Sequence, residues 1–310
     1  GVSFNKKKVF NYLEENNIFP SIPENKSFLF IPIIIDESKK DLLIFYNNKI
    51  YDFWNNASCG EELFLKSYTK KDYEFEFDER YRLEPCILDL AEFESTQGKI
   101  ILEIGVGLGA DHQRFIEAGA IMYGIDLTDR AIMNTKRRLK IFNHESNLEI
   151  GDAENLQFEK NFFDIVYSWG VIHHSSNTQK AVDEIYRVLK PEGIGKIMIY
   201  HKWSIVGLML WVKYGLFKLN PFIGLNRIYS EFLESPGTKA YSMKEAKDMF
   251  NKFSYIHVKT VLTHGDLLDG PAGQRHTGML LSIARRIWPK KLIKKIFPKF
   301  GLFMLISIKK

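Results

Sequence analysis

Residues 100–110 read IILEIGVGLGA, an apolar run followed by three glycines spaced two residues apart. The run over residues 100–104 predicts a buried β-strand, because it is short, continuous and rich in β-branched residues. Gly105, Gly107 and Gly109 then allow a tight turn and a close approach of the backbone to a ligand. A helix is expected from Asp111 to Ala118, with Gly119 as its C-cap. This strand, glycine turn and helix are typical of a nucleotide-type site in an α/β domain.

The same alternation continues along the chain. Further strands are expected over residues 121–125, 148–150, 163–167 and 196–200, with helices over residues 130–142 and about 181–189. Pro191 and Gly193 are expected to stop the second of these helices. A capping box at Ser242 opens another helix, and strands follow at 255–262 and 302–308. The pattern predicts an α/β fold, a Rossmann-like, doubly wound sheet of seven strands with the last strand antiparallel.

Two long insertions and an N-terminal extension surround this predicted core of residues 86–310. The extension spans residues 1–85, and its apolar segments at 28–35 and 42–51 predict two strands of a small β-containing element. The insertions span residues 202–241 and 263–301, and loops of this length usually carry function or helices of their own. Both leave strands on the carboxyl side of the sheet, so we expect them to act as lids over one pocket mouth.

Charge and cysteine content limit the function classes. The 310-residue chain carries a net charge of +5, but residues 285–310 hold nine Lys/Arg and no acid, which leaves residues 1–284 at −4. An acidic body lacks the basic face that binds nucleic acid. Two cysteines favour a reduced, cytoplasmic protein and make no metal cluster. We also expect no signal peptide and no membrane span.

The glycine turn by itself leaves two enzyme classes and one structural alternative open. Asp126 ends the second predicted strand 21 residues after Gly105, where a carboxylate can accept hydrogen bonds from ribose hydroxyls. Gly105, Gly107 and Ala110 also satisfy the dinucleotide pattern G-x-G-x-x-A, which keeps an NAD-dependent oxidoreductase in contention. A turn that only packs a strand on a helix is the structural alternative.

Three further segments decide between these alternatives. They are GDAENL at 151–156, FDIVYSWGVIHH at 163–174 and RVLKPEG at 187–193, each at the end or start of a predicted strand. With them, residues 83–201 resemble the class I S-adenosylmethionine-dependent methyltransferases, in the group that includes the ubiquinone/menaquinone methyltransferases and many small-molecule methyltransferases. The resemblance implies S-adenosylmethionine as cofactor and a cavity without a phosphate-binding loop.

The resemblance also implies a role for individual residues. Glu103 and the backbone of Gly105, Gly107 and Gly109 are expected at the methionine moiety, and Asp126 at the ribose. The other expected cofactor contacts are Leu127 beside the adenine, Asp152 at the adenine amino group with backbone contacts from Ala153, and Ser168 and Trp169 at the methionine side. Arg80, Tyr81 and Arg82 lie just before the core and are candidates for the cofactor carboxylate or an anionic acceptor.

Candidate bases follow from the same topology. A hydroxyl acceptor needs a base within hydrogen-bond reach. His173 and His174 follow the fourth strand and His201 follows the fifth, at the edge where α/β ligands bind. His264 and Asp266 lie in the second insertion.

These observations predict in-line methyl transfer to a small-molecule, sugar, lipid or peptide-like acceptor, at oxygen. Nitrogen or carbon acceptors, an NAD-dependent oxidoreductase and a non-catalytic cofactor-binding subunit are the alternatives. The basic C-terminal segment is compatible with contact to an anionic membrane, or with a helix packed on the sheet. The motifs name neither the acceptor nor the oligomeric state.

Overall fold

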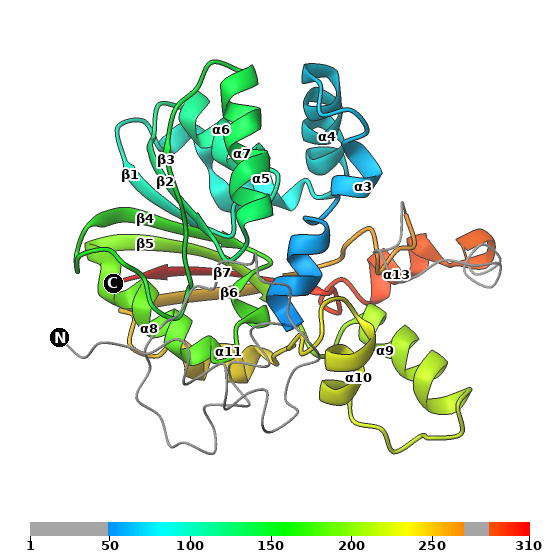
Figure 1. The fold of residues 1–310 in the computed structure, drawn as a ribbon. Helices are drawn as coiled ribbons and strands as arrows, with labels where there is room; N and C mark the ends of the chain where they lie inside the picture. The colour runs from blue at the N-terminus through cyan, green and yellow to red at the C-terminus, as the bar shows by residue number, and fades with distance from the viewer. Residues whose placement is uncertain (1–48, 270–284) are drawn as a thin grey trace, which may run out of the picture. The chain divides into compact units, whose positions relative to one another are not determined.

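The computed structural model describes residues 49–269 and 285–310, which lie within one compact unit of residues 41–310. Its centre is a seven-stranded sheet of order β3-β2-β1-β4-β5-β7-β6 (Figure 1). The strands are β1 (Ile100–Ile104), β2 (Ile121–Asp126), β3 (Asn147–Ile150), β4 (Phe163–Trp169), β5 (Leu189–Tyr200), β6 (Tyr255–Val261) and β7 (Phe303–Lys309). β7 is antiparallel to both its neighbours and the other paired strands are parallel, which confirms the predicted sheet.

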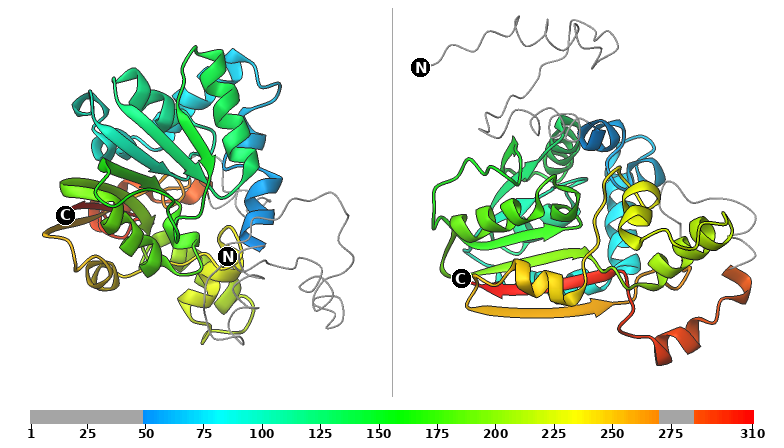
Figure 2. Two further views of the ribbon diagram at one scale, coloured as in Figure 1. Left: turned by 60° about the vertical axis from the view of Figure 1, so that its left-hand side comes forward. Right: turned by 90° about the horizontal axis from the view of Figure 1, so that it is seen from below.

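Helices cover both faces of the sheet because successive apolar residues of each strand point to opposite sides. In β4, Ile165 and Tyr167 pack into one core and Val166 packs into the other. The first face carries α4 (Lys70–Leu83), α5 (Cys86–Ala91), α6 (Ala110–Glu117) and α7 (Asp129–Ile141). The second carries α8 (Thr178–Val188) and α11 (Met243–Met249), which lie in front of the sheet in the right-hand view of Figure 2. The sheet is therefore doubly wound.

Local sequence signals place most helix boundaries. The Thr128 and Asn177 side chains cap α7 and α8, and Ser242 with Glu245 forms the expected capping box of α11. The end of the predicted helix at 181–189 is wrong by one residue, and the fifth strand begins much earlier than predicted. Leu189 already pairs with Phe163, so Pro191 and Gly193 lie inside an irregular start of β5.

The described part of the N-terminal extension is helical. The predicted strand at 28–35 lies outside the described residues, as does that at 42–51 except for residues 49–51. Within the described residues, 49–56 are helical. Ile50, Phe53 and Trp54 recur at helical spacing and all line the cavity described below, which explains why this segment is a helix there. α3 (Glu61–Phe64) and η1 (Phe93–Ser95) complete this part of the chain.

Both insertions leave the sheet at the same level, as predicted. Tyr200 at the end of β5 and Val261 at the end of β6 both pair with Phe303 of β7. The first insertion forms α9 (Ile205–Trp211), η3 (Val212–Leu216) and α10 (Leu225–Phe232), and the second contains α13 (Lys290–Ile296). Ile205, Leu267 and Ile293 pack together and join α9 to α13. No helix of residues 49–269 and 285–310 has the length and apolar character needed to span a membrane.

Candidate active site

The glycine turn after β1 has a backbone shape that side chains oppose. Gly105 has a φ of +86°, and a Cβ there would stand 2.1 Å from a methyl carbon of Val171, in the loop after β4. Gly107 has a φ of +54° and its missing Cβ would meet nothing within 4 Å. Both residues line a cavity of about 1080 Å³. The turn thus packs closely against Val171 at Gly105, whereas at Gly107 it leaves space for a ligand.

Two carboxylates stand at the ends of β2 and β3 beside this turn. Asp126 accepts hydrogen bonds from the Thr128 N–H at 3.0 Å, the Thr128 hydroxyl at 2.8 Å and the Gly107 N–H at 3.3 Å. Asp152 uses one oxygen to accept from the Glu154 N–H at 2.8 Å. Burial raises the pKa of both carboxyls. Neither forms an ion pair with a described residue, so their remaining lone pairs are available to the hydroxyl or amino groups of a ligand.

Glu103 of β1 is buried and lines the cavity beside the turn. Its carboxyl lies 2.8 Å from Nδ1 of His112, and Nε2 of His112 lies 2.7 Å from the Ser146 hydroxyl, which donates to the Met122 carbonyl. Nε2 therefore carries the proton, and a neutral His112 accepts at Nδ1. Burial raises the pKa of Glu103 well above its usual range and lowers that of His112 to about 3, in keeping with a protonated Glu103 that donates to Nδ1.

Asp111, near the start of α6, joins the extension to the core. It accepts from Arg80 Nε at 2.9 Å and from the hydroxyls of Tyr81 at 3.0 Å and Tyr167 at 2.7 Å. Burial acts to raise the pKa of Asp111, but Arg80 and the two hydroxyls outweigh it and hold the pKa below its usual value. Arg80 and Asp111 line the cavity. Arg82 is bound to Glu79 on an exposed face, so of the predicted Arg80–Tyr81–Arg82 set only Arg80 reaches the cavity.

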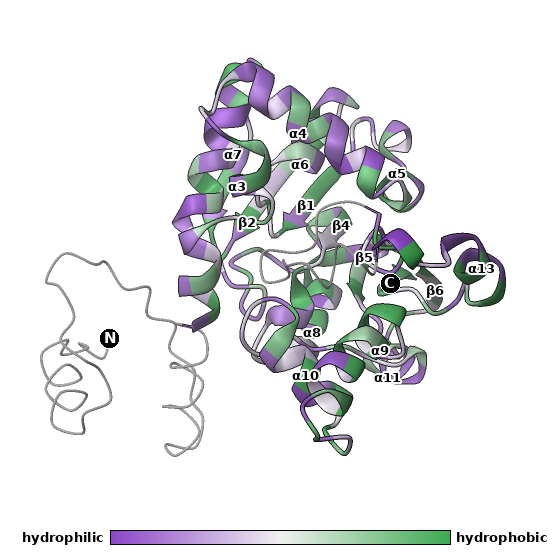
Figure 3. Ribbon diagram, turned by 90° about the vertical axis from the view of Figure 1, so that its right-hand side faces the viewer, coloured by the Kyte–Doolittle hydropathy of each residue, from purple (hydrophilic) through white to green (hydrophobic). Residues whose placement is uncertain are grey.

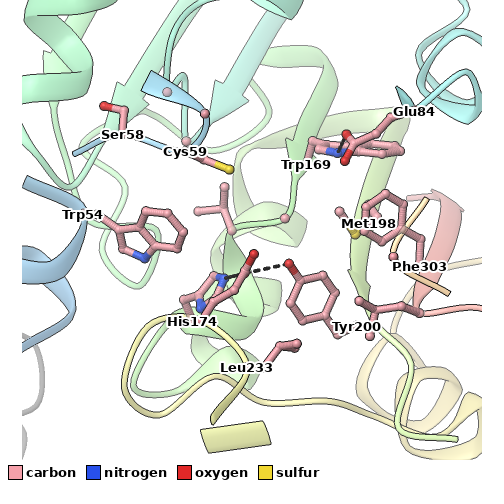
Figure 4. Close-up of a pocket in the computed structure, with 18 of the residues that line it drawn as sticks. Trp54, Ser58, Cys59, Glu84, Trp169, His174, Met198, Tyr200, Leu233 and Phe303 are labelled. Atoms are coloured by element: carbon pink, nitrogen blue, oxygen red, sulfur yellow. Dashed lines mark hydrogen bonds and ion pairs between the residues drawn. The ribbon is translucent and has the colours of Figure 1, made fainter. Parts of the chain in front are cut away.

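A second polar group lies at the other end of the cavity, between β5, η2 (Ile172–His174) and the segment after α10 (Figure 4). The Tyr200 hydroxyl donates to Glu234 at 2.7 Å, and Nε2 of His174 lies 3.7 Å from the same carboxylate. Nδ1 of His174 lies 2.8 Å from the Ser235 hydroxyl. Burial lowers the pKa of His174 to about 3, so the imidazole is neutral at pH 7. Its Nε2 makes no hydrogen bond with the described residues and faces Glu234.

The other predicted bases have different surroundings. His173 is fully buried, does not line the cavity, and packs between the rings of His174 and Tyr200 at 4.2 and 4.1 Å. Nδ1 of His201 lies 3.1 Å from the Gly301 carbonyl, away from the cavity lining. Asp266 accepts from three backbone N–H groups, which fixes the second insertion, whereas His264 does line the cavity.

The predicted cofactor residues gather along one wall of the cavity. Those that line it are Glu103, Gly105, Gly107, Gly109, Asp126, Leu127, Asp152, Ala153 and Trp169. Ser168 does not: it is fully buried and its hydroxyl donates to the Ile104 carbonyl at 3.2 Å, which ties β4 to β1. No group of His, Cys, Asp and Glu in the described part of the chain is arranged to hold a metal ion.

Several cavity residues escaped the sequence analysis. Trp54 comes from the extension, Glu84 accepts from the Trp169 indole at 3.0 Å, and Glu234 follows α10. No motif marks these positions. Tyr200, in contrast, could have been predicted from the sequence, because it is the last residue of β5 and directly precedes the candidate base His201. Adjacent strand residues point to opposite faces, and Tyr200 is the one of the two that lines the cavity.

Comparison with known proteins assigns this core to a family. Residues 102–196 match the family model of a methyltransferase domain. The chain carries a class I S-adenosylmethionine-dependent methyltransferase domain. Two features of the domain suit this cofactor: Asp126 and Asp152 line the cavity with lone pairs that no ion pair with a described residue takes up, and Gly107 has no Cβ to obstruct a ligand.

Curated relatives of the methyltransferase domain act on different acceptors. Phosphoethanolamine N-methyltransferase 2 of Caenorhabditis elegans is 30% identical over 172 residues, 53% of this chain and 34% of the relative. Sterol 24-C-methyltransferase of Saccharomyces cerevisiae is 28% identical over 130 residues, 38% of this chain and 34% of the relative. The chain thus spans about a third of the length of these two relatives.

A solved relative has the same fold. Phosphoethanolamine N-methyltransferase 2 of Haemonchus contortus, in complex with phosphomonomethylethanolamine and S-adenosylhomocysteine, superposes with a TM-score of 0.52 at 17% identity. The alignment covers 84% of this chain and 60% of that structure.

Proposed function

We propose that this methyltransferase transfers a methyl group from S-adenosylmethionine to an oxygen atom of an apolar small molecule. The observation that carries the proposal is the continuity of the cavity. One space of about 1080 Å³ is lined at one end by the glycine turn and its carboxylates and at the other by the insertions. This volume exceeds the usual range for a single small ligand, roughly 300–1,000 Å³. It suits a cofactor and an acceptor held together.

At the cofactor end, we assign each polar residue a contact with the cofactor that its surroundings in the structure support. S-adenosylmethionine supplies a methyl group on a positively charged sulfur. Asp126 accepts from the ribose hydroxyls, Asp152 accepts from the adenine amino group, and Glu103 loses its proton to balance the positive charge. Arg80 is held by Asp111 at the cavity wall, where a guanidinium suits the cofactor carboxylate.

The acceptor end favours an apolar molecule. Its apolar walls come from β5, β7, α9 and the segment after α10. They include Met198, Leu233 and Phe303 (Figure 4), together with Ile205, Met209 and Leu210 of α9. Such a surface gains free energy when it covers hydrocarbon, at about 25 cal/mol per Å² of apolar area removed from water. A sugar or a phosphorylated amine carries more polar groups than His174, Tyr200 and Glu234 can pair, and the rest would lie unpaired against the apolar wall, which costs free energy. We therefore propose a lipid-like or ring-containing acceptor over the other predicted acceptor classes.

His174 and Glu234 supply the base in this proposal. Neutral His174 can accept the hydroxyl proton at Nε2, which makes no hydrogen bond with the described residues. The imidazolium so formed lies 3.7 Å from the Glu234 carboxylate, which stabilises it. Tyr200 donates to the same carboxylate and fixes its position. The oxygen–carbon bond forms as the carbon–sulfur bond breaks, and the proton ends on His174. Of the predicted bases, His174 is thus the one that we propose.

The reaction is proposed to take place in the cytoplasm. Cys59 and Cys86 are both free thiols, as expected of a reducing compartment.

Calorimetry and product analysis test the proposal in two stages. Titration of the full chain with S-adenosylmethionine is expected to give one site, and titration with NAD none. Binding of NAD alone would instead support the oxidoreductase. Extracts fractionated by polarity are then incubated with methyl-labelled cofactor, and label is expected in the apolar fraction on an ether or ester oxygen. Label on nitrogen or carbon would correct the acceptor atom, and cofactor binding without turnover would favour a non-catalytic subunit.

A further inference from the structure

Apolar side chains of the first insertion project into solvent around the cavity mouth. Leu208 of α9 is 58% exposed and Phe217, just after η3, is 76% exposed, yet both also line the cavity. In the loop that follows, Leu219 is 92% and Phe222 is 96% exposed. A single exposed apolar residue needs no explanation, but a contiguous group beside a cavity marks an interaction surface. Here the apolar wall of the cavity continues onto the outside of the protein.

α13 extends this surface. Of its apolar residues only Ile293 is buried, in the contact with α9, while Leu292 and Ile296 are exposed. Phe297 and Phe300, just beyond the helix, are exposed as well. The structure therefore does not favour the alternative that the apolar face of α13 is buried against the sheet. α13 and α9 lie at the same end of the molecule in the right-hand view of Figure 2, and Figure 3 shows polar and apolar residues side by side on α13.

The charge of this surface has a single sign. We name residues 203–222 together with residues 285–300 the docking rim. The rim contains no Asp or Glu, and it carries Lys213, Lys218, Arg285, Arg286, Lys290, Lys291, Lys294, Lys295 and Lys299. Lys290 pairs with Asp269, but Lys291, Lys294, Lys295 and Lys299 are exposed and form no ion pair with any described carboxylate.

From this combination we infer that the docking rim binds the surface of an anionic lipid bilayer and that the acceptor enters the cavity from that surface. Exposed Phe and Leu side chains insert at the boundary between headgroups and acyl chains, and neighbouring lysines pair with anionic headgroups. A second copy of the chain could cover the most exposed side chains, Leu219 and Phe222, but would bring like-charged lysines together, and an acidic protein surface pairs with the lysines but not with these apolar side chains. A bilayer accounts for both. The cavity mouth then faces the source of an apolar acceptor.

Binding to vesicles tests the inference without cofactor or acceptor. The full chain is sedimented with vesicles of phosphatidylcholine alone and of phosphatidylcholine mixed with phosphatidylglycerol. Binding is expected to the mixed vesicles, and to weaken at high salt, because salt screens exposed charges. Triple replacement K291Q/K294Q/K295Q is expected to weaken binding about a hundredfold, from a typical gain of about 1 kcal/mol per lysine near an anionic surface.

Two control variants separate the rim from general surface properties. F217S/F222S removes apolar groups of the rim and is expected to reduce binding, whereas Met133→Ser on α7, a residue 52% exposed, leaves it unchanged. K136Q/K247Q removes two exposed lysines from α7 and α11 as the control for charge.

The inference fails if the rim variants bind like the parent, if binding does not depend on anionic lipid, or if the rim instead mediates a dimer that F217S/F222S dissociates. It rests on the apolar acceptor of the proposed function, but vesicle binding and the titration with S-adenosylmethionine can each fail alone.

Discussion

His174 and Glu234 face each other at the acceptor end of the cavity, with the imidazole Nε2 3.7 Å from the carboxylate. They are 60 residues apart in the sequence and come from different parts of the fold, η2 and the segment after α10. The first insertion therefore supplies a charged group to chemistry that begins at the edge of the core sheet. If His174 accepts the proton, this contact makes the insertion part of the reacting site rather than only a cover.

The first prediction concerns turnover. His174→Asn is expected to lower kcat by about 10²–10⁴-fold, the usual contribution of a general base. Glu234→Gln is expected to lower it less, because the proton acceptor remains and only the stabilisation of the imidazolium is lost. Affinity for S-adenosylmethionine, measured by calorimetry, is expected to stay unchanged in both. Glu231→Gln, on the exposed side of α10, is the matched control. An unchanged kcat in His174→Asn rules out this histidine as the base.

The second prediction concerns stability in acid. Burial lowers the pKa of His174 to about 3 from an ordinary value of 6.5, so the unfolded chain binds a proton that the folded chain does not. The stability that this residue contributes is present above pH 6.5 and is lost as the pH falls toward about 3. Between these values its contribution falls by about 1.4 kcal/mol per pH unit. Urea unfolding at a series of pH values measures this slope.

The variant His174→Gln isolates the contribution. Its free energy of unfolding is expected to depend less steeply on pH below 6.5 than that of the parent, by about one proton. His112 is present in both proteins, so its own lowered pKa contributes equally to the two slopes. His257→Gln, on the exposed side of β6, is the control. Parallel slopes in the parent and in His174→Gln would refute the assignment of a buried neutral imidazole.

The order of elements was predictable from sequence because local signals carry it. The glycine turn at 105–109, the capping box at Ser242 and the alternation of strands and helices all depend on neighbours in the chain. The start of β5 was not predicted, because proline and glycine, here Pro191 and Gly193, usually interrupt helices and strands. Only the pairing of Leu189 with Phe163 shows that the strand begins before them.

The site divides in the same way. Its cofactor wall lies at strand ends and follows from motif positions such as Asp126. The acceptor wall is built by contacts between distant segments, as in the pairing of Tyr200 with Glu234, and no sequence spacing encodes them. The sequence alone does not distinguish Arg80 from Arg82, because it does not show which face of α4 packs on the core. Only the packing of α4 on α6 shows which of the two side chains faces Asp111.

The third prediction tests the cofactor wall. Asp126→Asn keeps the shape of the residue but replaces a carboxylate oxygen by an amide donor, which cannot accept from a ribose hydroxyl. Hydrogen bonds to charged groups contribute roughly 1.5–3 kcal/mol, so affinity for S-adenosylmethionine is expected to fall at least tenfold by calorimetry. Asp183→Asn, on the exposed side of α8, is expected to bind like the parent. Equal affinity in Asp126→Asn would remove this residue from the cofactor site.

The fourth prediction tests the glycine turn. Gly105→Ala places a Cβ 2.1 Å from Val171 in a backbone with a φ of +86°, so we expect a loss of stability from both steric contact and backbone strain. The second substitution Val171→Ala removes the two methyl carbons at 2.1 and 2.9 Å but leaves the Cβ of residue 171 at 3.0 Å and the backbone strain, so it is expected to restore part of the loss. Urea unfolding compares the single and double variants with Val171→Ala alone. Additive effects of the two substitutions would show that the contact does not limit residue 105.

The fifth prediction concerns the attachment of the first insertion. The Tyr229 side chain of α10 is fully buried, and its hydroxyl lies 2.8 Å from the Ser204 hydroxyl, 3.1 Å from the His201 carbonyl and 3.0 Å from the Lys202 carbonyl. Tyr229→Phe keeps the ring and removes the hydroxyl from the two carbonyls and from Ser204, which still accepts from the Gly207 N–H, at a cost of about 1–3 kcal/mol. Because the loss falls between α10 and the start of α9, it is expected to loosen the insertion rather than the sheet.

Limited proteolysis separates these two outcomes. Cleavage of Tyr229→Phe within residues 202–241 is expected to be faster than in the parent, while the affinity for S-adenosylmethionine is retained, since the residues of the cofactor wall are untouched. Tyr255→Phe, on the exposed start of β6, is the matched control and is expected to be cut like the parent. Loss of cofactor binding together with faster cleavage would mean that the insertion and the cofactor wall unfold as one unit, and the insertion would then be part of the core rather than a separate lid.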